Sequence, residues 1–446
     1  MNRYPLLSKV LMVCLMALLL LIPLNMIQSK ISERQGLQSS VQQDIARSSA
    51  GPQTINGPYL VIKYRVRLRE TTEDDEGNEK VVVSESALQE TVLSPRTLKI
   101  DGNANVETRN RGIYQARLFN MQSTIAGDFV VPAGYGINRP LKDIIPDSAY
   151  FVVSVSDARG IVKVPLLTLN GERLEFAPGS VSPVSGNGIH VQLPSPELEH
   201  AHSFHFEFPF NLQGMSTLAV TPAGSNTEMS LQSPWPHPSF SGDFLPRTRT
   251  VDSKGFRADW SVSNLARNTA SGVGLRQVAT PEVFAVGFID PINVYLMSER
   301  AVKYGILFVL LVFTSFVMFE IMRGLRIHPL QYMLVGLSMA MFFLLIISLS
   351  EHIPFLLAYI ISGAACVALI GAYLSGMLKN RRLAFSFSGG IAMLYAVLYG
   401  VLQSEDNALL MGTLIIFGAL AAVMMLTRNM DWYRFNQTSA AERGAA

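Results

Sequence analysis

The chain is poor in charge and has almost no cysteine. Charged residues make up 16% of its 446 residues, against about 25% in an ordinary soluble protein, so much of the chain must lie out of water. The two cysteines, Cys14 and Cys366, both lie inside apolar runs. The long polar segment between those runs therefore has no disulfide, no thiol chemistry and no cysteine-based zinc site. A formal net charge of +2 gives no reason to expect a nucleic-acid partner.

Sequence motifs of well-known enzymes are also missing. There is no glycine-rich phosphate loop ending in Lys-Ser/Thr, no H-E-x-x-H and no G-x-S-x-G. These absences remove the simplest enzyme classes, although an enzyme of another class stays open.

Long apolar stretches are present instead. A helix that crosses the hydrocarbon core of a bilayer needs about 20 mostly apolar residues. The first stretch follows Arg3 and Lys9 and could be a secretory signal peptide, but residues 23–27 offer no small-x-small cleavage site. We interpret it as an uncleaved anchor. The six predicted transmembrane helices are Val10–Ile27, Tyr304–Met322, Leu330–Ser350, Ile353–Leu378, Leu383–Leu402 and Ala408–Leu426.

The basic residues outside the long segment 28–303 predict the orientation. If the N-terminus is cytoplasmic, all ten face the cytoplasm, and the two short outer turns, 351–352 and 403–406, carry no Lys or Arg. This is a positive-inside pattern, and it predicts an integral membrane protein with both termini in the cytoplasm. We expect the membrane to be a bacterial inner membrane. The ten residues are Arg3, Lys9, Arg323, Arg326, Lys379, Arg381, Arg382, Arg428, Arg434 and Arg443.

The predicted organisation therefore has four parts. Residues 1–27 form the cytoplasmic N-terminus and first anchor, 28–300 a periplasmic domain, 301–427 a five-helix bundle and 428–446 a cytoplasmic tail. The periodicity of the first part of the periplasmic domain, about 28–48, predicts a helical stalk. The rest can be one domain or two.

Beyond the stalk the apolar residues alternate, as in half-buried strands. Lys63–Arg69 and Phe204–Phe210 alternate in this way, Tyr150–Val153 resembles a fully buried strand, and an acidic turn before Lys80–Val83 predicts a hairpin. Short strands separated by proline and glycine favour a sandwich. The predicted fold class is an α+β membrane protein with a large, mostly antiparallel β domain.

Two polar segments supply candidate ligand contacts. The first segment, 154–160, follows a buried strand and ends at a glycine. Its Asp157 and Arg159 could face a ligand, or they could form a structural ion pair within a turn. Residues 235–246 hold three prolines and three aromatic residues, and a stiff aromatic loop is either a binding surface or a rigid cap over the core. From this loop we select Trp235, His237 and Asp243.

Histidines and membrane-edge charges are weaker candidates. His200, His202 and His205 cluster near His190, but ligands on opposite faces of one strand cannot converge, so we expect neither a metal site nor a cofactor. Charges beside a membrane suggest function by default. Glu351 and His352 occupy an outer turn, where both could be hydrated. Glu320 lies three residues before Arg323, a spacing typical of a helical ion pair.

Seven segments carry a recognisable pattern: 49–53, 156–160, 235–246, His328-Pro329-Leu330-Gln331-Tyr332, 334–338, 350–352 and 428–433. Together they resemble the CreD (Cet) family of bacterial inner-membrane proteins. The resemblance implies a role in envelope integrity and colicin tolerance, in a regulon that responds to carbon source and cell-wall stress. It implies no reaction, cofactor or catalytic residue.

Three functions follow from these observations. The first is a non-enzymatic stress-response protein whose periplasmic domain senses or binds an envelope component, whether a lipid, a glycan or a membrane protein. The second is a lipid-handling or transport protein, because five clustered helices exceed what anchoring requires. The third is a periplasmic hydrolase, which would need two carboxyl groups about 5–9.5 Å apart in a cleft.

Overall fold

The computed structural model describes residues 5–73, 79–179, 181, 187–267, 282–290, 293–323, 327–378, 381–403 and 408–428. The chain forms two compact units. The helical unit comprises Met1–Gln38 and Ile292–Ala446, and the β-rich unit comprises Ser39–Pro291.

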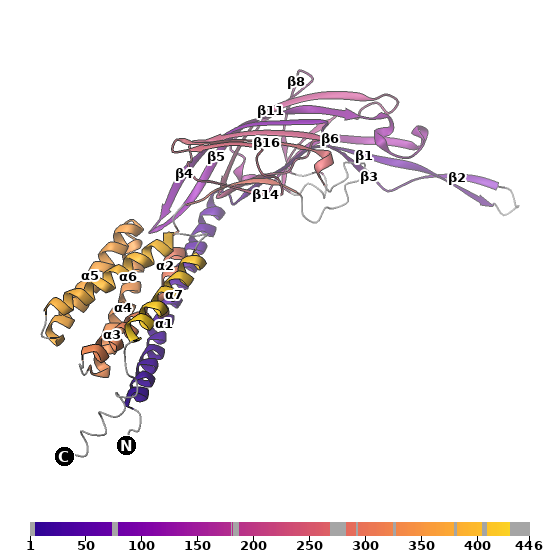
Figure 1. Ribbon diagram of the computed structural model, residues 1–446. Coiled ribbons are helices and arrows are strands. Elements are labelled where there is room, and N and C mark those ends of the chain that lie inside the picture. The colour runs from indigo at the N-terminus through magenta and orange to yellow at the C-terminus, as the bar shows by residue number, and fades with distance from the viewer. Residues whose placement is uncertain are drawn as a thin grey trace, which may run out of the picture. The chain divides into compact units, whose positions relative to one another are not determined.

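Each of the six predicted apolar stretches coincides with a helix (Figure 1). By length and hydropathy, four described helices can cross a membrane, and α2 with α3, bent by 42°, would make a fifth. The apolar part of the last helix, Leu410–Met425, is shorter. The helices are α1 Pro5–Ser48, α2 Val294–Lys303, α3 Gly305–Arg323, α4 Pro329–Ser350, α5 Phe355–Leu378, α6 Arg381–Gln403 and α7 Ala408–Thr427.

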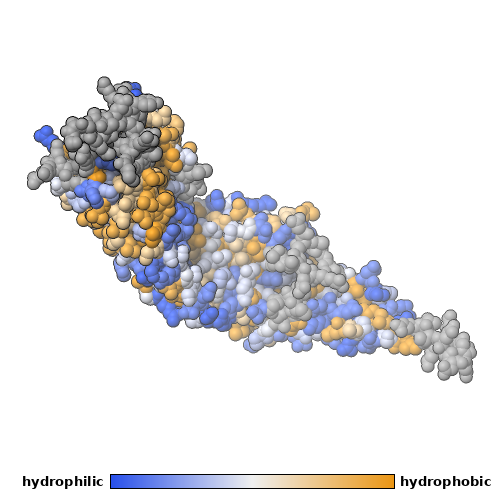
Figure 2. All heavy atoms as spheres, turned by 90° about the horizontal axis from the view of Figure 1, so that it is seen from below, coloured by the Kyte–Doolittle hydropathy of each residue, from blue (hydrophilic) through white to orange (hydrophobic). Residues whose placement is uncertain are grey.

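The helical unit is apolar on its outside as well as inside. Leu344, Leu357 and Ile360 are exposed, whereas Phe313, Phe342 and Tyr332 are buried. Hydrophobic residues gather over the helical part of the visible surface (Figure 2). Helices that are apolar all round belong in a membrane, so the structure is that of a membrane protein with several apolar helices.

The β-rich unit consists of two packed sheets. One follows the order β14-β17-β12-β1-β6-β10-β9, with β2 and β3 also paired to β1, and the other follows β15-β16-β13-β4-β5-β11-β7-β8. The strands are β1 Gln53–Glu73, β2 Glu79–Glu85, β3 Gln89–Leu93, β4 Thr97–Arg111, β5 Tyr114–Val131, β6 Ile144–Val155, β7 Leu166–Leu169, β8 Glu172–Glu175, β9 Ala177–Pro178, β10 Gly188–Leu193, β11 His202–Met215, β12 Thr217–Val220, β13 Asn226–Ser233, β14 Pro238–Gly242, β15 Thr248–Asp252, β16 Gly255–Ser263 and β17 Phe284–Phe288.

Most neighbouring strands are antiparallel, but both sheets are mixed. β1 pairs with β12, and β13 with β4, in parallel. Both pairs join strands far apart in the sequence, which strand-by-strand alternation does not predict. The predicted hairpin is confirmed, because Arg67–Glu73 pairs with Glu79–Glu85 in a ribbon that continues past the other strands (Figure 1).

One hydrophobic core joins the two sheets. The predicted alternation in β11 is confirmed, because Phe206, Phe208 and Phe210 are fully buried. The ring centroids of Phe206 and Phe208 lie 5.2 and 5.8 Å from that of Phe151, and Phe208 lies 5.4 Å from Phe176. Because successive side chains in a strand point to opposite faces, the residues between them, Glu207 and Pro209, lie on the outer face and are exposed.

Candidate functional site

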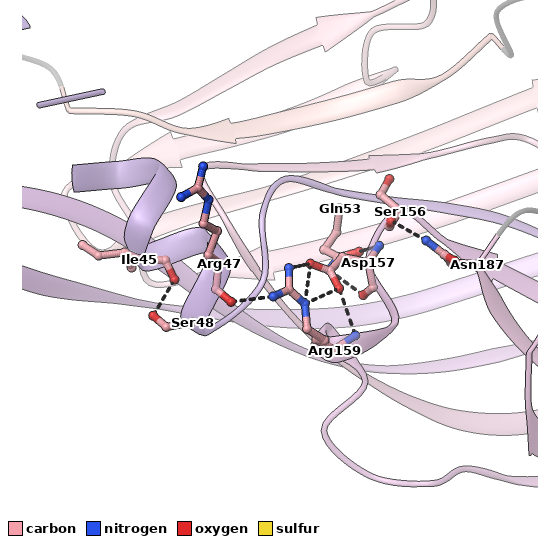
Figure 3. Close-up of polar contacts among 8 residues, drawn as sticks. All are labelled: Ile45, Arg47, Ser48, Gln53, Ser156, Asp157, Arg159 and Asn187. Atoms are coloured by element: carbon pink, nitrogen blue, oxygen red, sulfur yellow. Dashed lines mark hydrogen bonds and ion pairs between the residues drawn. The ribbon is translucent and has the colours of Figure 1, made fainter. Parts of the chain in front are cut away.

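Asp157 and Arg159 form a compact turn with each other (Figure 3). The turn is the 3-10 helix Ala158–Gly160, whose N-cap is Asp157. The Asp157 carboxylate accepts hydrogen bonds from the Arg159 backbone N–H at 3.1 Å, from Nε at 2.9 Å and from Nη2 at 2.6 Å. The hydrogen bond from Arg159 is the main cause that lowers the pKa of Asp157, so this carboxyl group stays ionised at neutral pH.

The same turn is attached to two other segments. Arg159 Nη1 donates to the carbonyl oxygen of Arg47, in the last turn of α1, where a cation compensates the negative end of the helix dipole. The buried side chain of Gln53 donates to Asp157 O at 3.0 Å and accepts from Asp157 N at 3.2 Å. A Cβ atom at Gly160 would lie 2.4 Å from Gln53 Nε2, so this glycine permits the contact.

The segment 235–246, called the Trp235 loop below, begins between β13 of one sheet and β14 of the other and contacts an arginine of β5. Arg117, on β5, lies 5.0 Å from the centroid of the Trp235 ring and also pairs with Asp290. The indole N–H donates to the carbonyl oxygen of His237 at 3.0 Å. The Trp235 ring is partly buried against the core, while His237 is exposed.

Asp243 joins the end of β14 to the start of β17. Its Oδ2 accepts from the backbone N–H of Val283 at 2.9 Å, and its own N–H donates to Val283 O at 2.7 Å. The Asp243 carboxyl group and backbone N–H thus hold the end of β14 against the residue that precedes β17.

The sheet register shows that the two candidate segments do not converge. Phe240, Val286, Leu218 and Gln53 form one row across β14, β17, β12 and β1. Three strand spacings, about 14 Å, separate the first of these residues from the last. The Trp235 loop and the Asp157 turn therefore contact different parts of the β-rich unit.

At the membrane-edge turn of the helical unit, Glu351 is buried and paired. Its side chain is 8% exposed, so little of it is open to water. Oε1 accepts from the hydroxyl of Tyr295 at 3.2 Å and lies 3.5 Å from Nε of Arg34 on α1. His352 is exposed.

Glu320 forms a buried cluster that the sequence pattern did not predict. It accepts hydrogen bonds from Lys9 Nζ, from the backbone N–H of Ile327 at 2.8 Å and from the hydroxyl of Tyr332 at 2.9 Å. The side chain is 2% exposed. Arg323, which spacing made the obvious partner, is outside the described side chains. The one signal in the sequence was a single acid in an apolar span.

The segment 328–332 gains a physical explanation from this cluster. His328 is the N-cap of α4, and its side chain accepts from the Leu330 N–H at 3.2 Å. Gln331 accepts from the His328 N–H at 3.0 Å, which completes a capping box. Pro329 occupies the first helical turn, and Tyr332 then contacts Glu320.

The four histidines named above have separate environments. His205 Nδ1 lies 2.9 Å from Asp128 Oδ1, and His190 Nδ1 lies 2.9 Å from the carbonyl oxygen of Gly179. His202 stacks on Phe204 at 6.3 Å, and His200 lies 3.9 Å from Glu197. Within the described part of the chain, no group of three or more His, Cys, Asp or Glu residues could hold a metal ion.

The sheet that begins with β15 has a surface hollow on its outer face, over the neighbouring strands β15, β16, β13 and β4. An open hollow of about 500 Å³ is lined by Asn103, Asn105, Gln232, Ser233, Pro234, Thr250, Asp252, Lys254, Gly255, Phe256 and Arg257. Within the helical unit, two apolar hollows of about 420 and 250 Å³ lie between α5 and α6 and share Val367. The larger volume falls within the range of about 300–1,000 Å³ that is typical of small-ligand pockets, and the smaller volume falls just below it.

Comparison with known proteins agrees with the architecture. The profile of the family described as "Inner membrane protein CreD" matches residues 5–433. The curated Inner membrane protein CreD of Escherichia coli (strain K12) is 39% identical over 423 residues, which cover 94% of this chain and 92% of that protein.

A solved M1 zinc metallopeptidase from Deinococcus radiodurans is 11% identical and has a TM-score of 0.20, with 44% of this chain and 43% of that one covered. This score supports no conclusion about fold or function. The profile match and the E. coli relative, by contrast, span nearly the whole chain, and the protein therefore belongs to the CreD family of inner membrane proteins.

Proposed function

We propose that this protein is a non-enzymatic envelope-integrity protein whose β-rich unit binds an envelope component in the periplasm. Six transmembrane helices, with both termini in the cytoplasm, hold that unit. The ten basic residues outside 28–303 support this orientation. The strands of the β-rich unit follow α1 and precede α2 in the chain, so both connections lead into the proposed transmembrane helices.

The orientation has a direct test. In a Cys14→Ser, Cys366→Ser background, one cysteine replaces the exposed Ser203 of β11, and a matched chain carries one cysteine added after Ala446. We expect a membrane-impermeant maleimide to label Ser203→Cys in spheroplasts and to label the C-terminal cysteine only after lysis. The reverse pattern would refute the proposed topology.

The open polar hollow of about 500 Å³ is the observation on which the binding proposal rests. Of the five candidate contacts, we propose Trp235 and His237 as a partner-facing edge, because the imidazole of His237 is exposed. The polar atoms of Asp157, Arg159 and Asp243 bind neighbouring segments, and we propose that these residues position the loops. The hollow does not support the hydrolase alternative, which requires two carboxyl groups, because its lining includes a single carboxylate, Asp252.

Co-purification tests the binding proposal. The full chain is extracted into nanodiscs, and bound lipids, glycans and crosslinked proteins are identified by mass spectrometry. We expect one enriched envelope molecule that is reduced by His237→Ala and retained by Asp243→Asn, which keeps a hydrogen-bond acceptor. The absence of any enriched envelope molecule in the wild-type protein would refute the binding proposal.

A lipid-handling protein is the second candidate, favoured by the hollows between α5 and α6. Their lining is mostly small and apolar, with Tyr359, Tyr395 and Tyr399 toward one end. An aromatic side chain should fill this space in Ala392→Phe, whereas Ala422→Phe on the exposed face of α7 is the matched control. Loss of a co-purifying lipid only in Ala392→Phe would favour this candidate, and equal lipid content in both would count against it.

A further inference from the structure

The sheet that runs from β15 to β8 carries seven neighbouring Asn and Gln side chains on its outer face. Gln232, Asn103, Gln122 and Asn211 occupy one registered row across β13, β4, β5 and β11. Asn105, Asn120 and Gln213 form the adjoining row. Alternation places all seven on the face opposite the core, and five of them are exposed while Asn211 and Gln213 are half-buried.

This composition is unusual for a strand surface. Asn is depleted in strands because it fits a pleated, half-buried surface poorly, whereas Thr, Val and aromatic residues are enriched. A sheet face that only had to be soluble would be served by Thr, Lys or Glu. The concentration of amides in neighbouring strands therefore indicates a requirement other than solubility.

The seven amides are free to bind a ligand. Within the described chain, no hydrogen bond engages any of these side chains. Each carboxamide offers two N–H donors and one carbonyl acceptor, held at a strand spacing of about 4.8 Å. The first row measures about 14 Å across the strands, the second measures about 10 Å, and about 7 Å separates the two rows. Three of their residues line the hollow.

The charge of this face narrows the ligand class. Among the described residues, the charged residue in register with the rows is Arg257, whose guanidinium lies 3.7 Å from Asp259 and donates to Ser230. The lining of the hollow adds one acid and one base, Asp252 and Lys254. A phosphate-rich polymer would need several free cations, and a lipid chain would need an apolar surface. A ligand that presents many uncharged groups, each both donor and acceptor, matches carboxamides best.

We infer that the two amide rows and the adjoining hollow bind a glycan, through hydroxyl and N-acetyl groups on successive sugar rings. The inference rests on the proposed function and specifies its ligand class and site. The rows accept the extended part of the glycan, and the hollow lined by Asn103, Asn105 and Gln232 holds one ring. The chemistry fits sugar chains from peptidoglycan and from lipopolysaccharide alike.

The test uses the full chain in nanodiscs and two glycan probes. They are peptide-free peptidoglycan strands and the oligosaccharide released from lipopolysaccharide, with anionic phospholipid vesicles as a third arm. The variant Asn103→Thr/Gln122→Thr/Gln232→Thr removes three adjacent amides from one row. Because Thr favours strands, the sheet is retained, and emission from the buried Trp260 checks the fold. The matched control is Asn226→Thr, six residues from Gln232 on the same face of β13.

We expect saturable binding of at least one glycan, a dissociation constant at least tenfold higher in the triple variant, and no change in Asn226→Thr. The glycan that binds identifies the source. Failure of both glycans to bind, or equal affinity in the triple variant, would overturn the inference. If an envelope lipid or protein still co-purifies with the wild-type chain in that case, the proposed function stands and only the glycan assignment falls.

Discussion

The buried Glu320 cluster gives the sharpest prediction about the helical unit. Tyr332→Phe deletes one hydroxyl that donates to the carboxylate at 2.9 Å. Glu320 is 2% exposed, so water does not replace the donor. A hydrogen bond to a charged group contributes about 1.5–3 kcal/mol, and we expect the helical unit to lose about 2 kcal/mol of its free energy of opening.

Glu320→Gln tests the charge itself. The amide keeps an acceptor for the backbone N–H of Ile327, but all three hydrogen bonds lose their charge assistance, which is worth about 1 kcal/mol each. Lys9 is 32% exposed, so its ammonium regains some hydration and offsets part of the loss. We expect Glu320→Gln to lower the free energy of opening of the helical unit by about 2–3 kcal/mol. In the double variant with Lys9→Met the cost should be smaller than the sum of the single costs, because residues in one network are coupled.

Cys366 provides the assay. Its thiol is buried and contacts Ser338 and Tyr395, whereas Cys14 is exposed and is replaced by serine. Opening of the bundle exposes Cys366 to a thiol-reactive dye, and the labelling rate follows the opening equilibrium when closing is fast. A loss of 2 kcal/mol corresponds to about 30-fold faster labelling, at 1.36 kcal/mol per factor of ten.

The matched control is Tyr373→Phe, a half-exposed α5 tyrosine that should change the labelling rate less than threefold. The reasoning is refuted if Tyr332→Phe and Glu320→Gln label no faster than Tyr373→Phe. Additive costs in the double variant would refute the pairing of Lys9 with Glu320.

Three further predictions concern the β-rich unit, whose stability the tryptophan emission reports. The folded-state pKa of Asp157 is below its usual 3.8, so the stability that its carboxylate contributes is present above pH 3.8 and is lost as pH falls through the lower folded value. Asp157→Asn should therefore flatten that part of an acid-unfolding curve, and an unchanged curve would contradict the pairing with Arg159. Gly160→Ala would place a Cβ atom 2.3 Å from a carbonyl oxygen of β11 and should cost about 1–3 kcal/mol in a denaturant titration, whereas Gly51→Ala, with open space around it, should be near neutral. Arg117→Met removes the cation from the Trp235 ring and from its ion pair, and should cost about 1–2 kcal/mol with a red-shifted emission; an identical spectrum and midpoint would show that the contact contributes nothing.

Local patterns predicted the elements well. The alternation of Phe206, Phe208 and Phe210 follows from the two-residue period of a strand, and their burial confirms it. The hairpin between Arg67 and Glu85 could be predicted because its strands are neighbours in the chain. The six apolar stretches all became helices, since length and hydropathy are properties of a continuous segment.

Candidate chemistry was predicted less well, because partners are set by tertiary structure. Spacing suggested Arg323 for Glu320, but the described partner is Lys9, 311 residues away. The partners of Glu351 also depend on tertiary structure, because Arg34 and Tyr295 approach it from two other helices.

The sequence by itself determined the class of the protein. Its apolar stretches require a membrane, its alternating segments require strands, and its motifs carry the family resemblance. Only the tertiary structure decided which polar residues meet. Gln232, Asn103, Gln122 and Asn211 lie at scattered positions between 103 and 232, and the register of four strands brings them into one row. Pairing between distant strands depends on the packing of whole sheets, which no local period encodes.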